Sequence, residues 1–144
     1  MNTASERSSS MLIHLSALAT YVMPLGSIIL PLILWQTTKK DSSYVDHHGK
    51  EAVNFNLSFF LYNVISIVVL LGSVLGTVFT AIRVEDAADS SEIMGMLLGT
   101  GSFLTAIVVL SIIGIIKLIL MIIASVKANQ GVLYRYPLTI RFIK

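Results

Sequence analysis

The first cluster of side chains that could do chemistry lies between Tyr44 and Asn56. Asp46, Lys50 and Asn54 are spaced four residues apart, so a helix would place them along one stripe. Asp46 before Lys50 is the favourable order for an ion pair within a helix. We interpret this stretch as a polar helical entry to a membrane segment, stiffened by its own pairs and available for contacts.

His47 and Glu51 have a spacing compatible with metal binding. One helical turn would have to supply every ligand, however, and no second cluster is visible in the sequence. Cysteine is absent, which excludes thiolate chemistry. The sequence also contains no phosphate loop, dinucleotide fingerprint, nucleophile elbow or pair of catalytic carboxylates. We therefore predict no metal, no cofactor and no enzyme.

The second cluster is the C-terminal segment Tyr134–Lys144, whose tyrosines and arginines suit the headgroup layer of a membrane. Simple anchoring at the interface is one interpretation. The strand-like alternation from Leu138 indicates the alternative, which is pairing with another chain or with another part of this one. Because Arg135 and Arg141 complement Asp46 and Glu51, we expect the tail to touch the polar helical entry, with help from aromatic side chains. The predicted interaction face consists of Asp46, His47, His48, Lys50, Glu51, Asn54, Tyr134, Arg135, Tyr136 and Arg141.

A third candidate lies within the apolar part of the chain. Lys117 falls near the middle of an apolar stretch, where a cation is costly and is usually paired or functional. Asn63 and the carbonyl of Thr20, which Pro24 deprives of its helical donor, are expected at a similar depth. We predict a polar cluster of Lys117, Asn63 and Thr20, with snorkelling of the lysine toward the headgroups as the alternative.

Two patterns of small residues, Gly72–Gly76 and Gly95–Gly99, lie near the outer ends of two apolar stretches. Such spacing permits close approach of helix backbones in lipid. We expect a packing seam between the two stretches within one chain; a dimer interface is the alternative.

The elements that must position these residues follow from the composition. Of the 144 residues, 55% are hydrophobic and 12% are charged, about half the charged fraction of roughly 25% in soluble domains. Three apolar stretches, about 11–35, 52–82 and 93–126, each exceed the roughly 20 residues that cross a bilayer as a helix. We predict one all-α, polytopic membrane helix bundle, preceded by a polar N-terminal tail (1–10) and followed by a basic interfacial tail (127–144).

The first apolar stretch is interrupted by Pro24, Gly26 and Pro31. We prefer one crossing that is broken at Pro24–Gly26. Two half-helices that form a re-entrant hairpin are the alternative.

The basic residues are unevenly distributed along the chain. Seven of the ten Lys and Arg lie in the loop at 36–51 and in the tail at 127–144, whereas the connection at 83–92 is acidic. With three crossings, the positive-inside rule places the loop and the tail in the cytoplasm, and the N-terminus and the acidic connection outside. The basic residues favour anionic lipid as a partner at the cytoplasmic face, and we expect no nucleic acid.

Several of these motifs resemble a known family. His14-Leu-Ser16, the break at Pro24–Gly26, His48–Asn56 and Tyr134–Phe142 look like the small bacterial Tic-twenty-like membrane proteins, a family of unknown function that is distantly similar to a chloroplast inner-envelope protein-import subunit. The resemblance spans about 11–144. The family usually has glutamine at the position of Asn56, and its chloroplast relative is drawn with four crossings.

This resemblance implies the inner (plasma) membrane of a prokaryote and possible membrane-protein partners. The leading hypothesis is a non-enzymatic membrane component, related to protein translocation or insertion, that acts through partners. A small transporter or channel that uses the cluster around Lys117 is the second hypothesis, and a lipid-interacting, membrane-stabilising protein is the third.

Overall fold

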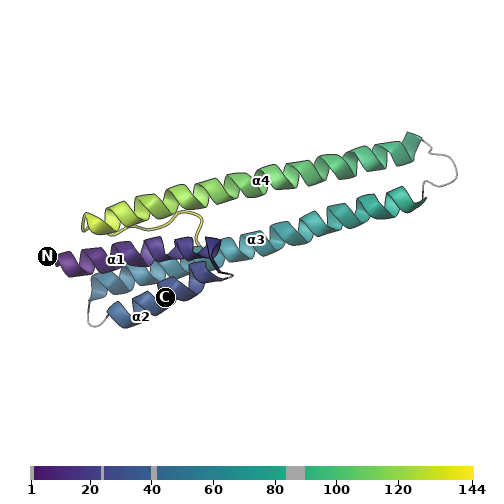
Figure 1. The fold of residues 1–144 in the computed structure, drawn as a ribbon. Helices are drawn as coiled ribbons and strands as arrows, with labels where there is room; N and C mark the ends of the chain where they lie inside the picture. Colours follow the sequence, from purple (N-terminus) through teal and green to yellow (C-terminus); the bar gives the residue numbers. More distant parts are fainter. Residues whose placement is uncertain (1, 24, 40–41, 84–89) are drawn as a thin grey trace. The chain divides into compact units, whose positions relative to one another are not determined.

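The computed structural model of the chain describes residues 2–23, 25–39, 42–83 and 90–144, and it is all-helical apart from turns and the extended tail (Figure 1). The helices, in chain order, are α1 (Ala4–Ser16), the 3₁₀ helix η1 (Ala17–Tyr21), α2 (Gly26–Thr38), α3 (Ser43–Arg83) and α4 (Ser90–Asn129). Two of them, over Ser43–Ile82 and Ile93–Asn129, are long and apolar enough to cross a membrane. The predicted small membrane helix bundle is therefore confirmed.

Helix α1 begins within the segment that we predicted to be a polar tail. Thr3 Oγ1 accepts a hydrogen bond from the backbone N–H of Glu6 at 3.2 Å, and the Glu6 carboxylate accepts one from the N–H of Thr3 at 2.6 Å. This is a capping box, which pairs two backbone donors that an open helix end would leave without partners. Residues 4–10 are consequently helical, and the prediction of a tail at 1–10 is wrong for them.

The first apolar stretch folds back on itself. Leu25 has a left-handed backbone with φ of 60°, and a Cβ on Gly26 would lie 2.5 Å from the carbonyl oxygen of Ala19. The absence of that Cβ lets α2 pack closely against the chain that precedes it. Helix α2 has 13 residues and is about 20 Å long, which is shorter than a hydrocarbon core of about 30 Å. The structure has the hairpin that we considered as the alternative, not one broken crossing; Pro24 lies outside the described residues.

This hairpin returns the chain to the end from which it started. Asn2 Nδ2 donates a hydrogen bond to the carbonyl of Gly131 at 3.3 Å, and Ser42 lies beside Glu6 in the same region. Asn2 and the start of the tail therefore lie side by side, and the orientation of the termini in the membrane stays a prediction. The acidic connection belongs to a different part of the chain, and its residues 84–89 lie outside the described residues.

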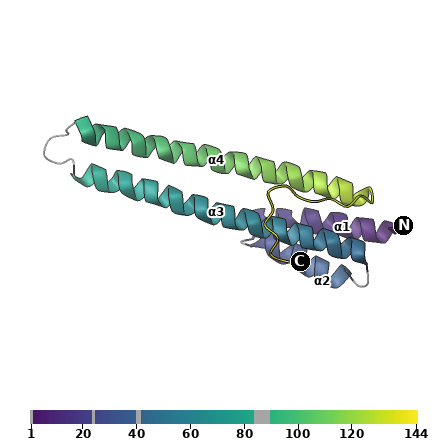
Figure 2. The same cartoon turned by 180° about the vertical axis from the view of Figure 1, so that it is seen from behind.

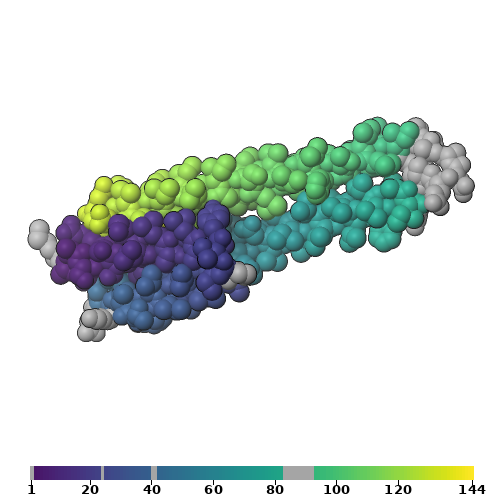
Figure 3. All heavy atoms as spheres, in the orientation of Figure 1, coloured from purple at the N-terminus to yellow at the C-terminus, as the bar shows by residue number. Residues whose placement is uncertain are grey.

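The chain divides into two compact units. Unit 1 comprises Met1–Phe60 and Ile116–Lys144, and unit 2 comprises Leu61–Ile115. In unit 1, α1 and α2 pack on the first part of α3 (Figure 3), around a core of Ile13, Trp35, Val45, Ala52 and Val53. The polar entry at residues 44–56 is continuous with the rest of α3, as expected.

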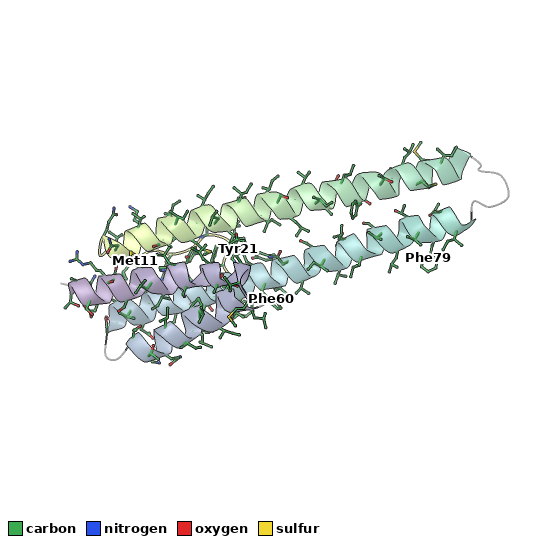
Figure 4. All side chains as sticks on the ribbon, viewed as in Figure 1. Met11, Tyr21, Phe60 and Phe79 are labelled. Carbon is green, nitrogen blue, oxygen red and sulfur yellow. The ribbon has the colours of Figure 1, made fainter. Side chains whose placement is uncertain are left out.

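Unit 2 is an antiparallel pair of helix segments from α3 and α4. Gly95 and Gly99 lie against Thr80 and Thr77, so half of the predicted glycine seam is present. No atom of the described residues lies within 4 Å of a Cβ placed on Gly72 or on Gly76, so these two glycines do not belong to the seam. The seam on α3 instead carries threonines, whose hydroxyls are bonded to carbonyls of their own helix. Phe79 projects from α3 away from α4 and is 64% exposed (Figure 4).

The tail after α4 runs back over the first part of α3 in an extended conformation (Figure 2). It turns at Leu138, whose φ is 57°. No strand is assigned to any described residue of the tail, although its sequence alternates. Its backbone groups bond to side chains of α3 instead of to another strand.

Candidate functional site

The polar entry of α3 contacts α2 through Asp46. Asp46 and Lys50 form the predicted ion pair, with 2.7 Å between Oδ2 and Nζ. The other carboxylate oxygen of Asp46 accepts a hydrogen bond from Trp35 Nε1 at 3.1 Å. About one third of each partner in the ion pair is exposed, so the pair contributes at most about 1 kcal/mol to stability. Its structural effect is to orient Trp35 against α3.

Glu51 connects α3 to the tail. One of its carboxylate oxygens accepts the backbone N–H of Tyr136 at 3.1 Å. The other lies 3.8 Å from a guanidinium nitrogen of Arg141. The side chain of Glu51 is 8% exposed and that of Arg141 is 51% exposed, so a nearly buried carboxylate meets a cation at the surface. The hydrogen bond fixes the tail, while the long ion pair leaves the guanidinium accessible.

Asn54 and Ser58 extend this attachment along the same face of α3. The Asn54 carbonyl oxygen accepts the N–H groups of Phe142 at 3.1 Å and Ile143 at 2.8 Å. Its amide nitrogen donates to the carbonyl of Ile143 at 2.8 Å. Ser58 Oγ accepts the N–H of Ile140 at 2.8 Å. A buried backbone group without a partner is costly, so these side chains stand in for a neighbouring strand.

Aromatic contacts complete the docking of the tail. The rings of Tyr136 and Phe55 are stacked, with centroids 3.8 Å apart, and Tyr134 meets Tyr136 edge to face at 5.3 Å. His47 Nε2 lies 3.3 Å from the carbonyl oxygen of Tyr134. The expected contact between the polar entry and the tail is thus confirmed.

A buried chain of hydrogen bonds joins α1, α3 and the tail. Tyr136 Oη lies 3.0 Å from His14 Nδ1, and His14 Nε2 lies 2.9 Å from His48 Nδ1. His48 Nε2 faces the backbone of Val132 but makes no hydrogen bond of standard geometry with any residue that the structure describes. If the tyrosine hydroxyl donates to His14 and His14 donates to His48, each neutral ring is both donor and acceptor. The bonds then all point in one direction, toward Val132.

Burial controls the charge state of this chain. Removal from water, together with the smaller effect of the neighbouring His48 and His47, lowers the pKa of His14 to about 3. Burial also raises the pKa of the Tyr136 hydroxyl well above its usual value. His14 and Tyr136 are therefore neutral at neutral pH, and their role in the fold is to form directional hydrogen bonds.

A cavity of about 400 Å³ opens where the tail meets α3. Four of its lining residues are basic, one is acidic and the others are a histidine, an amide and an isoleucine. The lining consists of His47, Lys50, Glu51, Asn54, Arg135, Arg141, Ile143 and Lys144.

Most of the predicted interaction face surrounds this cavity or the buried chain of hydrogen bonds. Asp46 and Lys50 pair on the α2 side, and Arg135 lines the cavity. Three members of the assembly were not predicted as site residues: His14, Tyr44 and Ser58. Tyr44 donates its hydroxyl proton to the carbonyl of Ala128 at 2.6 Å, which ties the end of α4 to α3.

Two of these omissions had signals in the sequence. The i, i+4 and i, i+7 spacing of Ser58 from Asn54 and Glu51 places it on the face already identified. His14 lies four residues after Ser10 on a helix that the capping box predicts, but the partner of His14 is 34 residues away, which periodicity cannot reveal.

The predicted polar cluster is not assembled within either unit. Lys117 and Thr20 belong to unit 1, whereas Asn63 belongs to unit 2. Thr20 is exposed, and Lys117 is partly buried. The convergence of these three residues stays a prediction.

Comparison with known proteins gives one result. The sequence model of the MamF/MmsF family, described as the magnetosome magnetite crystal formation protein family, matches residues 5–143. No curated protein and no solved structure matches the chain. The match covers nearly the whole chain, and it overturns the resemblance to the Tic-twenty-like proteins together with the translocation role that this resemblance implied. The chain is a membrane protein that belongs to the magnetosome magnetite crystal formation protein family.

Proposed function

We propose that this chain is a non-enzymatic component of the magnetosome membrane that takes part in magnetite crystal formation. The observation that carries the proposal is the family match over residues 5–143, together with two helices of membrane-crossing length. In this proposal unit 1 provides a fixed polar surface at the membrane face, and it acts by contact with anionic lipid or with protein partners.

The dimensions of unit 2 support a specific topology. Its helix segments at 61–82 and 93–115 have 22 and 23 residues and are each about 33 Å long, close to the thickness of the hydrocarbon core. Their side chains are largely apolar and exposed, as a lipid environment requires. We assign the membrane crossings to these two segments.

The distribution of charge then gives the orientation. Asn2, Ser42 and Gly131 lie at one end of unit 1, and the basic loop and tail belong to the same unit. The positive-inside rule places this end in the cytoplasm. The acidic connection, whose residues 84–89 lie outside the described residues, would then be on the lumenal side of a magnetosome membrane.

Single-cysteine labelling tests the topology, because the chain has no native cysteine. A membrane-impermeant reagent should label cysteines at positions 2 and 42 from the same side, and a cysteine at position 89 from the opposite side. Labelling of positions 2 and 42 from opposite sides would contradict this topology and would show that the first apolar stretch crosses the membrane once.

Deletion and complementation in a magnetosome-forming bacterium test the role in crystal formation. Loss of the chain should change the size or number of magnetite crystals seen by electron microscopy, and the wild-type chain should restore them. Unchanged crystals after deletion would contradict the proposed function.

A further inference from the structure

The cavity at the junction of the tail and α3 has the composition of an anion site. Lys50, Arg135, Arg141 and Lys144 line it, and Glu51 supplies the one acidic side chain among its lining residues. Its volume of about 400 Å³ falls within the range of roughly 300–1,000 Å³ typical of small-ligand sites. An excess of cations around a hollow of this size favours an anionic ligand over a metal ion.

The cations differ in how far they are already engaged. Lys50 is paired with Asp46 at 2.7 Å, and Arg141 reaches Glu51 only at 3.8 Å. Among the described residues, no ion pair is formed by Arg135 or Lys144. Two arginines and one lysine are therefore available to an incoming oxyanion. Guanidinium groups bind phosphate oxygens through paired N–H donors, which a lysine ammonium cannot do.

Buried side chains of α3 hold the backbone of the tail, which carries three of these cations. Asn54 is 2% exposed and Glu51 is 6% exposed, and both hold the tail through its N–H groups. Arg141 and Lys144 directly flank the two residues that Asn54 binds. The cations are consequently positioned by buried polar contacts, and the cost of ordering the tail has already been met in the free protein.

We propose that this cavity binds one phosphate group, with Arg135, Arg141 and Lys144 as its ligands and with Lys50 as a supporting charge. The phosphate can be that of an anionic lipid headgroup or free inorganic phosphate, since both present negatively charged phosphoryl oxygens. The inference rests on the proposed membrane role, because that role puts the cavity at the headgroup level on the cytoplasmic face.

The binding test uses the full-length chain in dodecyl maltoside micelles, whose headgroups carry no phosphate. The affinity for added phosphatidylglycerol is measured by native mass spectrometry, for the wild type and for the double variant Arg135→Gln/Lys144→Gln. Neither residue holds the fold through an ion pair, so the variant should keep its helix content by circular dichroism. A loss of roughly fivefold in affinity for each cation, about 25-fold for the pair, is expected.

The matched control is Lys39→Gln/Lys127→Gln, which removes the same charge from unit 1 at positions outside the cavity. It should leave the affinity unchanged. Equal losses in the two double variants would reduce the effect to general attraction between a basic protein and an acidic lipid, and would overturn the site. No loss in the cavity variant would overturn it as well.

Competition with inorganic phosphate, against chloride at equal ionic strength, identifies the source of the ligand. If phosphate displaces phosphatidylglycerol from the wild type, the site is one for the free ion; if it does not, the site is one for the lipid headgroup. Either outcome supports the site only when the cavity variant has lost its binding.

Crystal formation in cells separates this inference from the proposed function. Cavity variants that lose phosphate binding but restore normal crystals would leave both the site and the proposed function in place. If the wild-type chain fails to restore crystals in the deletion strain, the proposed function is contradicted, whereas the evidence for the phosphate site is unchanged.

Discussion

The two units of the chain solve the problem of polar groups in different ways. Among the described residues, every buried side chain belongs to unit 1. Nine of these buried residues are polar or charged, and they come from α1, α2, α3 and α4: Ser10, His14, Ser27, His48, Glu51, Asn54, Asn56, Ser58 and Ser125. In unit 2 the hydroxyls of Ser73, Thr77 and Thr80 bond to carbonyls four residues earlier in their own helix.

This difference explains why the packing partners of unit 1 are fixed residues of the same chain, whereas those of unit 2 are not. A buried polar atom that is satisfied by a distant residue fixes the position of that residue, since breaking the contact leaves a costly unpaired group. A hydroxyl that is satisfied within its own helix imposes no such constraint. Unit 2 can therefore use lipid as its packing partner, whereas unit 1 must complete its own contacts.

The cavities show the same contrast. The cavity of unit 1 is lined mainly by charged and polar side chains. A cavity of about 700 Å³ in unit 2 is lined mainly by apolar and small residues, which include Val69, Gly101 and Val109. Apolar lining of this kind suits hydrocarbon chains, and charged lining suits headgroups.

Removal of the Asn54 amide should have the largest effect. Asn54→Leu deletes three hydrogen bonds to the tail and should lower the free energy of unfolding by about 3–5 kcal/mol. Unfolding in detergent measures this change, and trypsin cleavage at Arg141 reports release of the tail. Asn56→Leu is the matched control and should be nearly neutral. Among the described residues, the Asn56 amide bonds only to its own helix and its Oδ1 has no hydrogen-bond partner. A tail that stays protected in Asn54→Leu would refute the proposed docking.

The buried His14 should make unit 1 sensitive to acid. Its folded pKa of about 3 lies below the value of 6.5 that the unfolded chain has, so between these pH values the unfolded state binds the extra proton. Stability is complete above pH 6.5 and falls as the pH drops, by about 1.4 kcal/mol per unit, until about pH 3. Thermal unfolding of the wild type and of His14→Gln between these limits measures the slope, which the substitution should reduce. Equal slopes would show that His14 takes up its proton without unfolding.

Two glycines test close packing in one unit against open surface in the other. A Cβ on Gly49 would collide with the ring of Trp35, whereas a Cβ on Gly72 would have no atom of the described part of the chain within 4 Å. Gly49→Ala should therefore destabilise by about 1–3 kcal/mol, and Gly72→Ala should stabilise by up to about 1 kcal/mol through helix propensity. The unfolding midpoints of the two variants in detergent, compared with that of the wild type, test both expectations. Destabilisation by Gly72→Ala would reveal a partner that covers this face.

A pair of serines gives the smallest expected difference. Ser58 Oγ accepts the N–H of Ile140, so Ser58→Ala should cost about 1–2 kcal/mol. Among the described residues, Ser73 Oγ bonds only to the carbonyl of Val69 in its own helix, and Ser73→Ala should change the free energy of unfolding by no more than about 0.5 kcal/mol. Equilibrium unfolding of the two variants side by side provides the measurement. Similar costs would mean that the polar contacts of unit 1 carry no special weight.

Much of unit 1 could be predicted from local patterns. The i, i+4 spacing of Asp46 and Lys50 predicted their pair, and the charges of the tail predicted its contact with α3. The capping box of Thr3 and Glu6 was also readable in the sequence, although we interpreted that segment as a tail. The direction of the chain after Tyr21 was not readable, because a proline–glycine break is compatible with a kink and with a reversal.

The sequence by itself determined that the chain is helical and belongs in a membrane, because its apolar stretches leave the backbone no alternative in lipid. It also determined which residues lie on the polar face of α3. Only the tertiary structure decided that α1 and α2 form a hairpin and that His14 meets His48. It likewise showed that Asn54 binds the backbone of the tail. These contacts join residues 34 and 89 positions apart, and such pairings depend on the packing of whole helices, which the local spacing of residues does not encode.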